Sequence, residues 1–167
     1  MPYSAKAVAN FFIDVDKVGG ITPMKIQKLV YFSHGWNLAI TGNPLISEPV
    51  QAWRFGPVIP SLYRECKEFG SEPIKEKLCD IEMQGTLIKW VAPTVTEEKD
   101  LALLQRVWSI YGKYTAIQLS NMTHQEGSPW RQVIAQFPNG NLPKGVTIPN
   151  DLIKTYFSNL ASMSQKG

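Results

Sequence analysis

The sequence is poor in the residues that build metal sites, disulfide frameworks and acid–base centres. Its 167 residues include two cysteines and two histidines, and the spacing of Cys66 and Cys79 matches no zinc motif. We therefore expect two reduced, largely structural thiols, no bound metal and no cofactor. A glycine-rich phosphate loop, a nucleophile elbow and an HExxH motif are also missing. These absences argue against an enzyme.

Charge and long hydrophobic runs are sparse as well. Charged residues make up 19% of the chain and the net charge is +3, without the dense basic clusters of a dedicated nucleic-acid-binding protein. The longest stretch without charge, between Lys28 and Glu48, is too polar to span a bilayer. The N-terminus lacks the pattern of a signal peptide. We expect a cytoplasmic protein that does not bind membranes, and the charge pattern does not favour nucleic acid as its partner.

Apolar residues are plentiful. They make up 44% of the chain and include five Trp, six Tyr and seven Phe, enough for the core of one domain over residues 1–167. Apolar residues recur at helical spacing between helix-start and helix-stop residues. We predict a mainly α fold, a compact single-domain bundle of six or seven helices with a minor β element. The expected helices cover about 4–19, 22–42, 59–70, 94–111, 115–122, 128–137 and 150–163.

The helix expected over residues 22–42 has the clearest boundaries and the most apolar surface. Thr22 and Pro23 form a strong helix start, and Gly42 ends the pattern. Its second half is apolar around almost the whole circumference, which is typical of a helix at the centre of a bundle. Elsewhere, capping-box spacing occurs twice, at Thr94 with Glu97 and at Thr115 with Gln118.

Two short segments have strand rather than helix character. Residues 50–55 alternate at strand period and are stopped by Gly56-Pro57, which predicts a short strand. Residues 81–91 form two apolar runs around Gly85-Thr86, which predicts a small hairpin.

Trp53, Arg54 and Phe55 are the best candidates for contact with a partner. Trp and Arg are the types most enriched at binding hot spots, because each combines a large contact area with a polar group. In a strand, either Trp53 and Phe55 or Arg54 alone would point outward. We predict that this strand end belongs to a partner-binding patch.

Two other segments with aromatic and polar residues are further candidates. Tyr31 and His34 share one helix face with Gln27, and this face either meets buried polar partners or reaches the surface to support the patch. A satisfied core histidine is the alternative for His34. His124 and Trp130 form either a local packing cluster or a second partner contact.

Three segments resemble the Panacea domain, also called the SocA-like family. They are KIQKLVYFSHGWNLAITGNPL (25–45), EPVQAWRFGPVIPSLYRE (48–65) and THQEGSPW (123–130). The resemblance covers about residues 5–135, and the tail from about Pro138 lies outside it. The combination of the helix with the AWxxGPV segment carries most of the specificity.

The resemblance implies an antitoxin of bacteria or their prophages that neutralises a cognate toxin by direct protein–protein contact. It does not identify the toxin, and it leaves open whether the chain also pairs with itself. Two alternatives remain: a nucleic-acid-binding transcriptional regulator, and an adaptor that delivers a bound protein to a protease.

Overall fold

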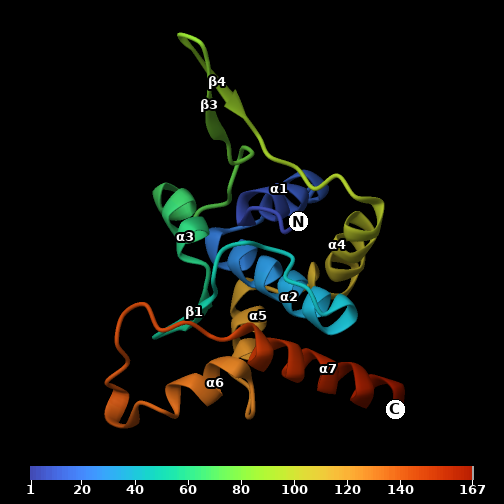
Figure 1. Cartoon of the computed structure of the whole chain (residues 1–167), viewed down its shortest axis with the longest axis vertical. Helices are drawn as coiled ribbons and strands as arrows, with labels where there is room; N and C mark the ends of the chain where they lie inside the picture. Colours follow the sequence, from blue (N-terminus) through green and yellow to red (C-terminus); the bar gives the residue numbers. More distant parts are fainter. Residues whose placement is uncertain (167) are drawn as a thin grey trace.

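The predicted mainly α architecture is confirmed in a computed structural model, which describes residues 1–166, with side chains up to residue 164. Within this range the chain forms seven α-helices and two separate antiparallel hairpins (Figure 1). The helices are α1 (Ala5–Val15), α2 (Pro23–Thr41), α3 (Pro60–Cys66), α4 (Glu98–Tyr111), α5 (Ala116–Thr123), α6 (Pro129–Ile134) and α7 (Asn150–Lys166).

The strands are short. They are β1 (Gln51–Trp53), β2 (Gly56–Val58), β3 (Asp80–Gln84) and β4 (Leu87–Val91), with 3₁₀ turns η1 (Lys67–Phe69) and η2 (Pro138–Gly140). None of the helices described is long and apolar enough to cross a bilayer.

Helix α2 occupies the centre of the molecule, as its sequence predicts. The Thr22 hydroxyl accepts a hydrogen bond from the Lys25 amide at 3.3 Å, and Gly42 ends the helix with a φ of 78°. α2 packs against α1, α3, α4, α5 and α7, so nearly all of its circumference is covered. The exceptions are its two ends, where Met24 is 50% and Ile40 69% exposed.

The two expected capping boxes differ in outcome. Thr115 and Gln118 form the reciprocal pair at the start of α5, with distances of 3.1 and 2.9 Å. The box at Thr94 is wrong: α4 begins at Glu98, and Glu97 caps it without a side-chain hydrogen bond. The Tyr3 hydroxyl, which donates to Asp100 at 2.8 Å, ties this helix start to the N-terminus instead.

The single strand predicted over residues 50–55 is instead the first arm of a tight hairpin. Trp53 pairs with Gly56, so Arg54 and Phe55 form the turn and do not alternate along a strand. The outer edge of β1 pairs with the 146–148 segment, where the Ala52 amide donates to the Val146 carbonyl at 2.8 Å. Part of the tail beyond the recognised motifs therefore supports this hairpin.

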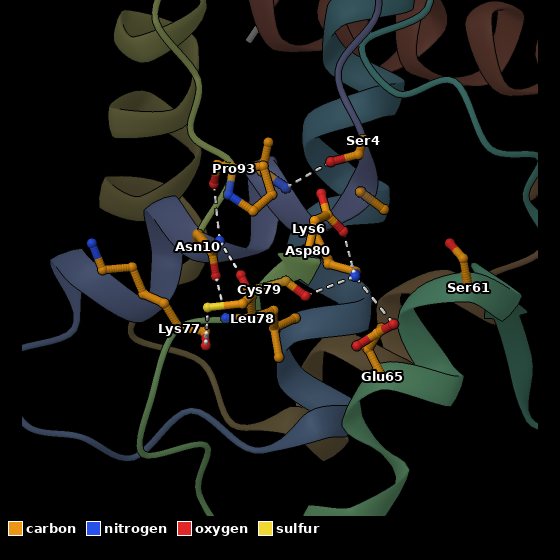
Figure 2. Close-up of polar contacts among 12 residues, drawn as sticks. Ser4, Lys6, Asn10, Ser61, Glu65, Lys77, Leu78, Cys79, Asp80 and Pro93 are labelled. Carbon is orange, nitrogen blue, oxygen red and sulfur yellow. Dashed lines mark hydrogen bonds and ion pairs between the residues drawn. The ribbon is translucent and has the colours of Figure 1, made fainter. Parts of the chain in front are cut away.

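The second hairpin, β3–β4, turns at Gly85-Thr86 as predicted and projects away from the helices (Figure 1). Its base is held by two side chains of α1. The amide of Asn10, which is buried, donates to the carbonyls of Leu78 and Pro93 at 2.8 and 2.9 Å and accepts from the Leu78 amide at 2.8 Å. Lys6 reaches Asp80 at 2.6 Å and Glu65 at 3.1 Å (Figure 2).

Asn10→Ala is expected to lower the free energy of unfolding by about 2 kcal/mol, because three backbone groups lose their partner at a buried position. Denaturant unfolding measures this loss, and hydrogen exchange should locate increased opening at residues 78–93. Lys77→Ala is the matched control: its ion pair with Asp14 is exposed, so a change within about 0.5 kcal/mol is expected. Equal effects from the two variants would contradict the anchoring role of Asn10.

Candidate functional site

The β1–β2 turn presents Arg54 and Phe55 at the surface. Phe55 is 77% exposed, and the Arg54 guanidinium lies 5.6 Å from the centre of its ring. Trp53 is half-buried and packs edge-on against Tyr63 of α3, with ring centres 4.9 Å apart. The predicted patch residues 53–55 thus lie together, with both turn residues exposed.

The turn is short, but its backbone is held at every second residue. The Trp130 indole donates to the Trp53 carbonyl at 2.7 Å, and Nε2 of His124 bonds the Phe55 carbonyl at 3.1 Å. The Lys28 ammonium donates to the Pro57 carbonyl at 3.1 Å. These side chains come from α2, the end of α5 and α6, so three parts of the fold fix one hairpin.

Gln27 holds the backbone of Ile59, two residues after Pro57, in the same way. Its side chain donates to the Ile59 carbonyl at 3.1 Å and accepts from the Ile59 amide at 3.0 Å. Because both backbone groups of Ile59 are satisfied at a buried position, the exit of the hairpin is fixed as firmly as its turn.

A groove of about 690 Å³ runs between this hairpin, the start of α2, the α3–η1 segment and α5. Its exposed lining is mostly carbon. The charged residues that line it are cationic, and none of the described lining residues is Asp or Glu. The lining consists of Pro23, Met24, Gln27, Lys28, Trp53, Arg54, Phe55, Val58, Tyr63, Cys66, Lys67, Gly70, Ile117, Ser120, Asn121 and His124.

Burial shifts the pKa values of the titratable groups in the groove. Burial lowers the pKa of Lys28 to about 8 and raises the pKa of the Cys66 thiol to about 11. Burial also lowers the pKa of His124, against its hydrogen bond to Phe55 and with a further lowering from Lys28 and Arg131. A protonated thiol and a histidine engaged with a carbonyl are suited to holding structure rather than to nucleophilic chemistry.

Tyr31 and His34 do not belong to this surface, and the prediction that their helix face supports the patch is wrong. Tyr31 is 2% and His34 1% exposed, because α7 and the 43–47 loop cover them. His34 Nδ1 accepts from the Leu45 and Ile46 amides, so Nε2 carries the proton and donates to Asn150 Oδ1 at 2.9 Å. His34 is therefore a satisfied core histidine.

The structure brings His124 to the groove and places Trp130 behind the hairpin. Their rings lie 4.4 Å apart, and Trp130 is only 8% exposed, so it positions the turn rather than offering a contact surface. Sequence reasoning missed Lys28 and Gly56. Gly56 has a φ of 125°, and a Cβ atom there would lie 3.0 Å from both the Lys28 ammonium and His124 Nε2.

No group of three His, Cys, Asp or Glu side chains in the described part of the chain is arranged to hold a metal ion. Both cysteines are free thiols. The site is thus an apolar groove with cationic groups, bordered by a rigid aromatic turn.

Comparisons with known proteins place the chain in a family. The model of the family described as antitoxin SocA-like, Panacea domain, matches residues 26–131, which include most of α2, the β1–β2 hairpin, most of the groove lining and Trp130. The antitoxin SocA of Caulobacter vibrioides (strain NA1000 / CB15N) is 34% identical over 155 residues, covering 92% of this chain and 81% of that protein. No solved structure matches the chain. The chain therefore belongs to the SocA-like antitoxins, the Panacea-domain family.

Proposed function

We propose that this chain neutralises a cognate toxin by binding it directly, and that the β1–β2 turn and its groove receive part of that toxin. Family membership supports the antitoxin role. The observation that carries the location is the turn itself: exposed Arg54 and Phe55 lie beside an apolar groove on a backbone fixed by three side chains.

The fixed backbone favours tight binding. A surface that is already held in its bound shape loses little conformational entropy on association. Trp53, Tyr63 and Phe55 supply aromatic contact area, and Arg54 adds a charged, hydrogen-bonding group. Such an aromatic and arginine cluster at the edge of a concave apolar surface is typical of a binding hot spot.

The same geometry argues against the start of α2 as a DNA-reading element. Such a role would need free basic side chains in the first turns. Lys25 donates to the Gly112 carbonyl at 2.7 Å and lies 5.6 Å from the centre of the Trp108 ring. Lys28 is 3% exposed. Both lysines are engaged within the fold, which favours a protein partner.

Co-expression tests the proposal. The toxin is sought as the product of the reading frame beside this gene, expressed in a bacterial host with and without this chain. We expect growth arrest that this chain relieves and a stable complex on co-purification. Toxin abundance, followed by immunoblot, separates neutralisation by binding from delivery to a protease, since delivery would lower the abundance. Relief of arrest without any complex would overturn direct neutralisation.

Arg54→Ala is expected to weaken toxin binding by about 1–3 kcal/mol, the scale of a lost hydrogen bond to a charged group. Because Arg54 is exposed, the melting temperature should stay within about one or two degrees of the parent. Titration calorimetry measures the affinity and a melting curve the stability. Arg106→Ala, an exposed arginine on α4, is the matched control and should leave both unchanged. Equal affinities for the two variants would place the interface elsewhere.

A further inference from the structure

Lys28 is a buried cation without a counter-ion. It is 3% exposed, and none of the ion pairs among the described residues includes it. One hydrogen bond, to the Pro57 carbonyl, is its recorded polar contact, although an ammonium group can donate three. A buried charge with so little compensation is costly to the fold, and a carboxylate partner would offset that cost.

Lys28 is buried in the wall of the groove. The absence of a side chain at Gly56 lets the Lys28 Nζ lie against the hairpin backbone, since a Cβ atom there would lie only 3.0 Å from it. Two further cations, Arg54 and Lys67, line the same groove. Glu65 and Glu68 lie on a different hollow, of about 390 Å³, beside Trp90 of β4. The lining of the groove is therefore positively charged.

We propose that the toxin segment that enters the groove carries a carboxylate, which pairs with the Lys28 ammonium beside Gly56. An apolar side chain of the same segment packs against Trp53 and Phe55. This inference rests on the proposed function and names the chemistry of the partner: an apolar residue next to Asp, Glu or a free C-terminus. In a groove lined mostly by carbon, such a pair is screened less by water than a surface pair.

Two small probes test the inference on the intact chain. N-acetyl-tryptophan has an indole and a carboxylate, and N-acetyl-tryptophan amide differs only in lacking the charge. NMR spectra of the lysine side chains and of the Trp indole groups report on Lys28 and Trp53 during titration. We expect the carboxylate to bind about tenfold or more tightly than the amide, the preference given by one charge-assisted hydrogen bond.

Substitution of the lysine separates the possible outcomes. Lys28→Met should abolish the preference even if the lost hydrogen bond to Pro57 also changes the amide affinity, and Lys67→Met, at an exposed cation of the same groove, should preserve the preference. Equal binding of both probes to the parent would overturn the carboxylate inference and leave the groove as a binding site. If neither probe binds, the groove is not a binding site, and the proposed location of the toxin contact is wrong as well.

An independent observation on the β3–β4 hairpin supports a second inference. Cross-strand pairs point to the same face of a hairpin. Ile81 pairs with Trp90 and Met83 with Ile88, so these four apolar residues share one face. The opposite face carries Asp80, Glu82, Lys89, Gln84, Leu87 and Val91.

The apolar face is uncovered. Its side chains are 58–67% exposed and offer about 500 Å² of apolar surface, as large as the largest patch on a typical monomer. An isolated two-stranded hairpin is marginally stable in water, yet this one projects from a base fixed by Asn10 and Lys6 (Figures 1 and 2).

We infer that the hairpin of a second copy covers this face in a two-fold symmetric dimer. Two such faces packed together remove at most about 1,000 Å² from water, which reaches the lower limit for a specific interface. A single face supplies only half of that area, and an identical hairpin supplies the other half. None of Ile81, Met83, Ile88 and Trp90 is charged, so these four residues bring no like charges together across a two-fold axis.

Two adjacent residues on opposite faces provide a matched test. Ile88 is 63% and Leu87 71% exposed, and the register points them in opposite directions. We expect the purified chain to sediment as a dimer and Ile88→Asp to raise its dissociation constant at least about a hundredfold, because each copy would bury an unpaired carboxylate. Leu87→Asp should dimerise like the parent. A monomeric parent, or equal effects of both substitutions, would overturn the inference.

Discussion

Gly35→Ala is expected to destabilise the fold by about 2–3 kcal/mol, although the same change in an exposed helix stabilises by about 1 kcal/mol. The reason is that Gly35, which has no side chain, leaves a notch in the surface of α2 that the Phe157 ring fills. A Cβ atom at Gly35 would lie 2.2–2.7 Å from three ring carbons of Phe157, the residue through which α7 docks. Denaturant unfolding measures the loss.

Phe157 has no room to move away. Its ring is fully buried and lies 5.2 Å from the ring of Trp36, 5.9 Å from Tyr31 and 6.0 Å from Phe32, all centre to centre. The added methyl group must therefore push α7 outward or strain α2, and protein interiors absorb such changes poorly.

A double mutant distinguishes this clash from other causes. Phe157→Leu removes ring atoms next to the notch, so Gly35→Ala should cost at least about 1 kcal/mol less in that background. Gly20→Ala is the matched control, because nothing lies within 4 Å of its added Cβ atom. Additive effects of the two substitutions would contradict direct contact between residues 35 and 157.

The elements of the fold could be predicted from the sequence because their signals are local. Thr22-Pro23 and Gly42 mark both ends of α2, and Gly85-Thr86 marks the turn of the second hairpin. The apolar circumference of α2 also gave its central position. One prediction of a local element was wrong. The strand pattern of residues 50–55 could not show that Arg54 and Phe55 form a turn.

The environment of the site depends on contacts between distant segments, and these could not be predicted. His34 is buried because Asn150, 116 residues later, bonds its ring. A polar face on a helix has the same sequence pattern whether another helix or water covers it. Lys28 was missed for the same reason, since a lysine near a helix start is usually exposed. Only the hairpin carbonyl at Pro57 and the groove show its role.

The free energy of unfolding of the parent, relative to Lys28→Met, should increase by about 3 kcal/mol between pH 7 and pH 11. Burial lowers the pKa of Lys28 from 10.5 to about 8 in the folded chain. Each pKa unit is worth about 1.4 kcal/mol, so the difference amounts to about 3 kcal/mol. Lys28 is 3% exposed, so little solvent screening reduces this value.

The sign follows from proton binding. Between about pH 8 and 10.5 the unfolded chain keeps the Lys28 proton and the folded chain releases it, so stability rises with pH over this range. Below about pH 8 both states are protonated, and the folded state carries the full cost of the buried charge. Above 10.5 both are neutral and that cost is gone.

The comparison with Lys28→Met isolates this one group. The thiol of Cys66 and the buried tyrosines, whose pKa values are also raised by burial, titrate in both proteins and cancel in the difference. The pKa of His124 is lowered, so its titration lies below the window. Denaturant unfolding of both proteins at a series of pH values gives the difference curve. Parallel curves would show that the Lys28 ammonium is solvated. They would contradict the presence of a buried cation in the groove. A rising curve would show that this antitoxin-family fold keeps, at neutral pH, a charge that weakens it.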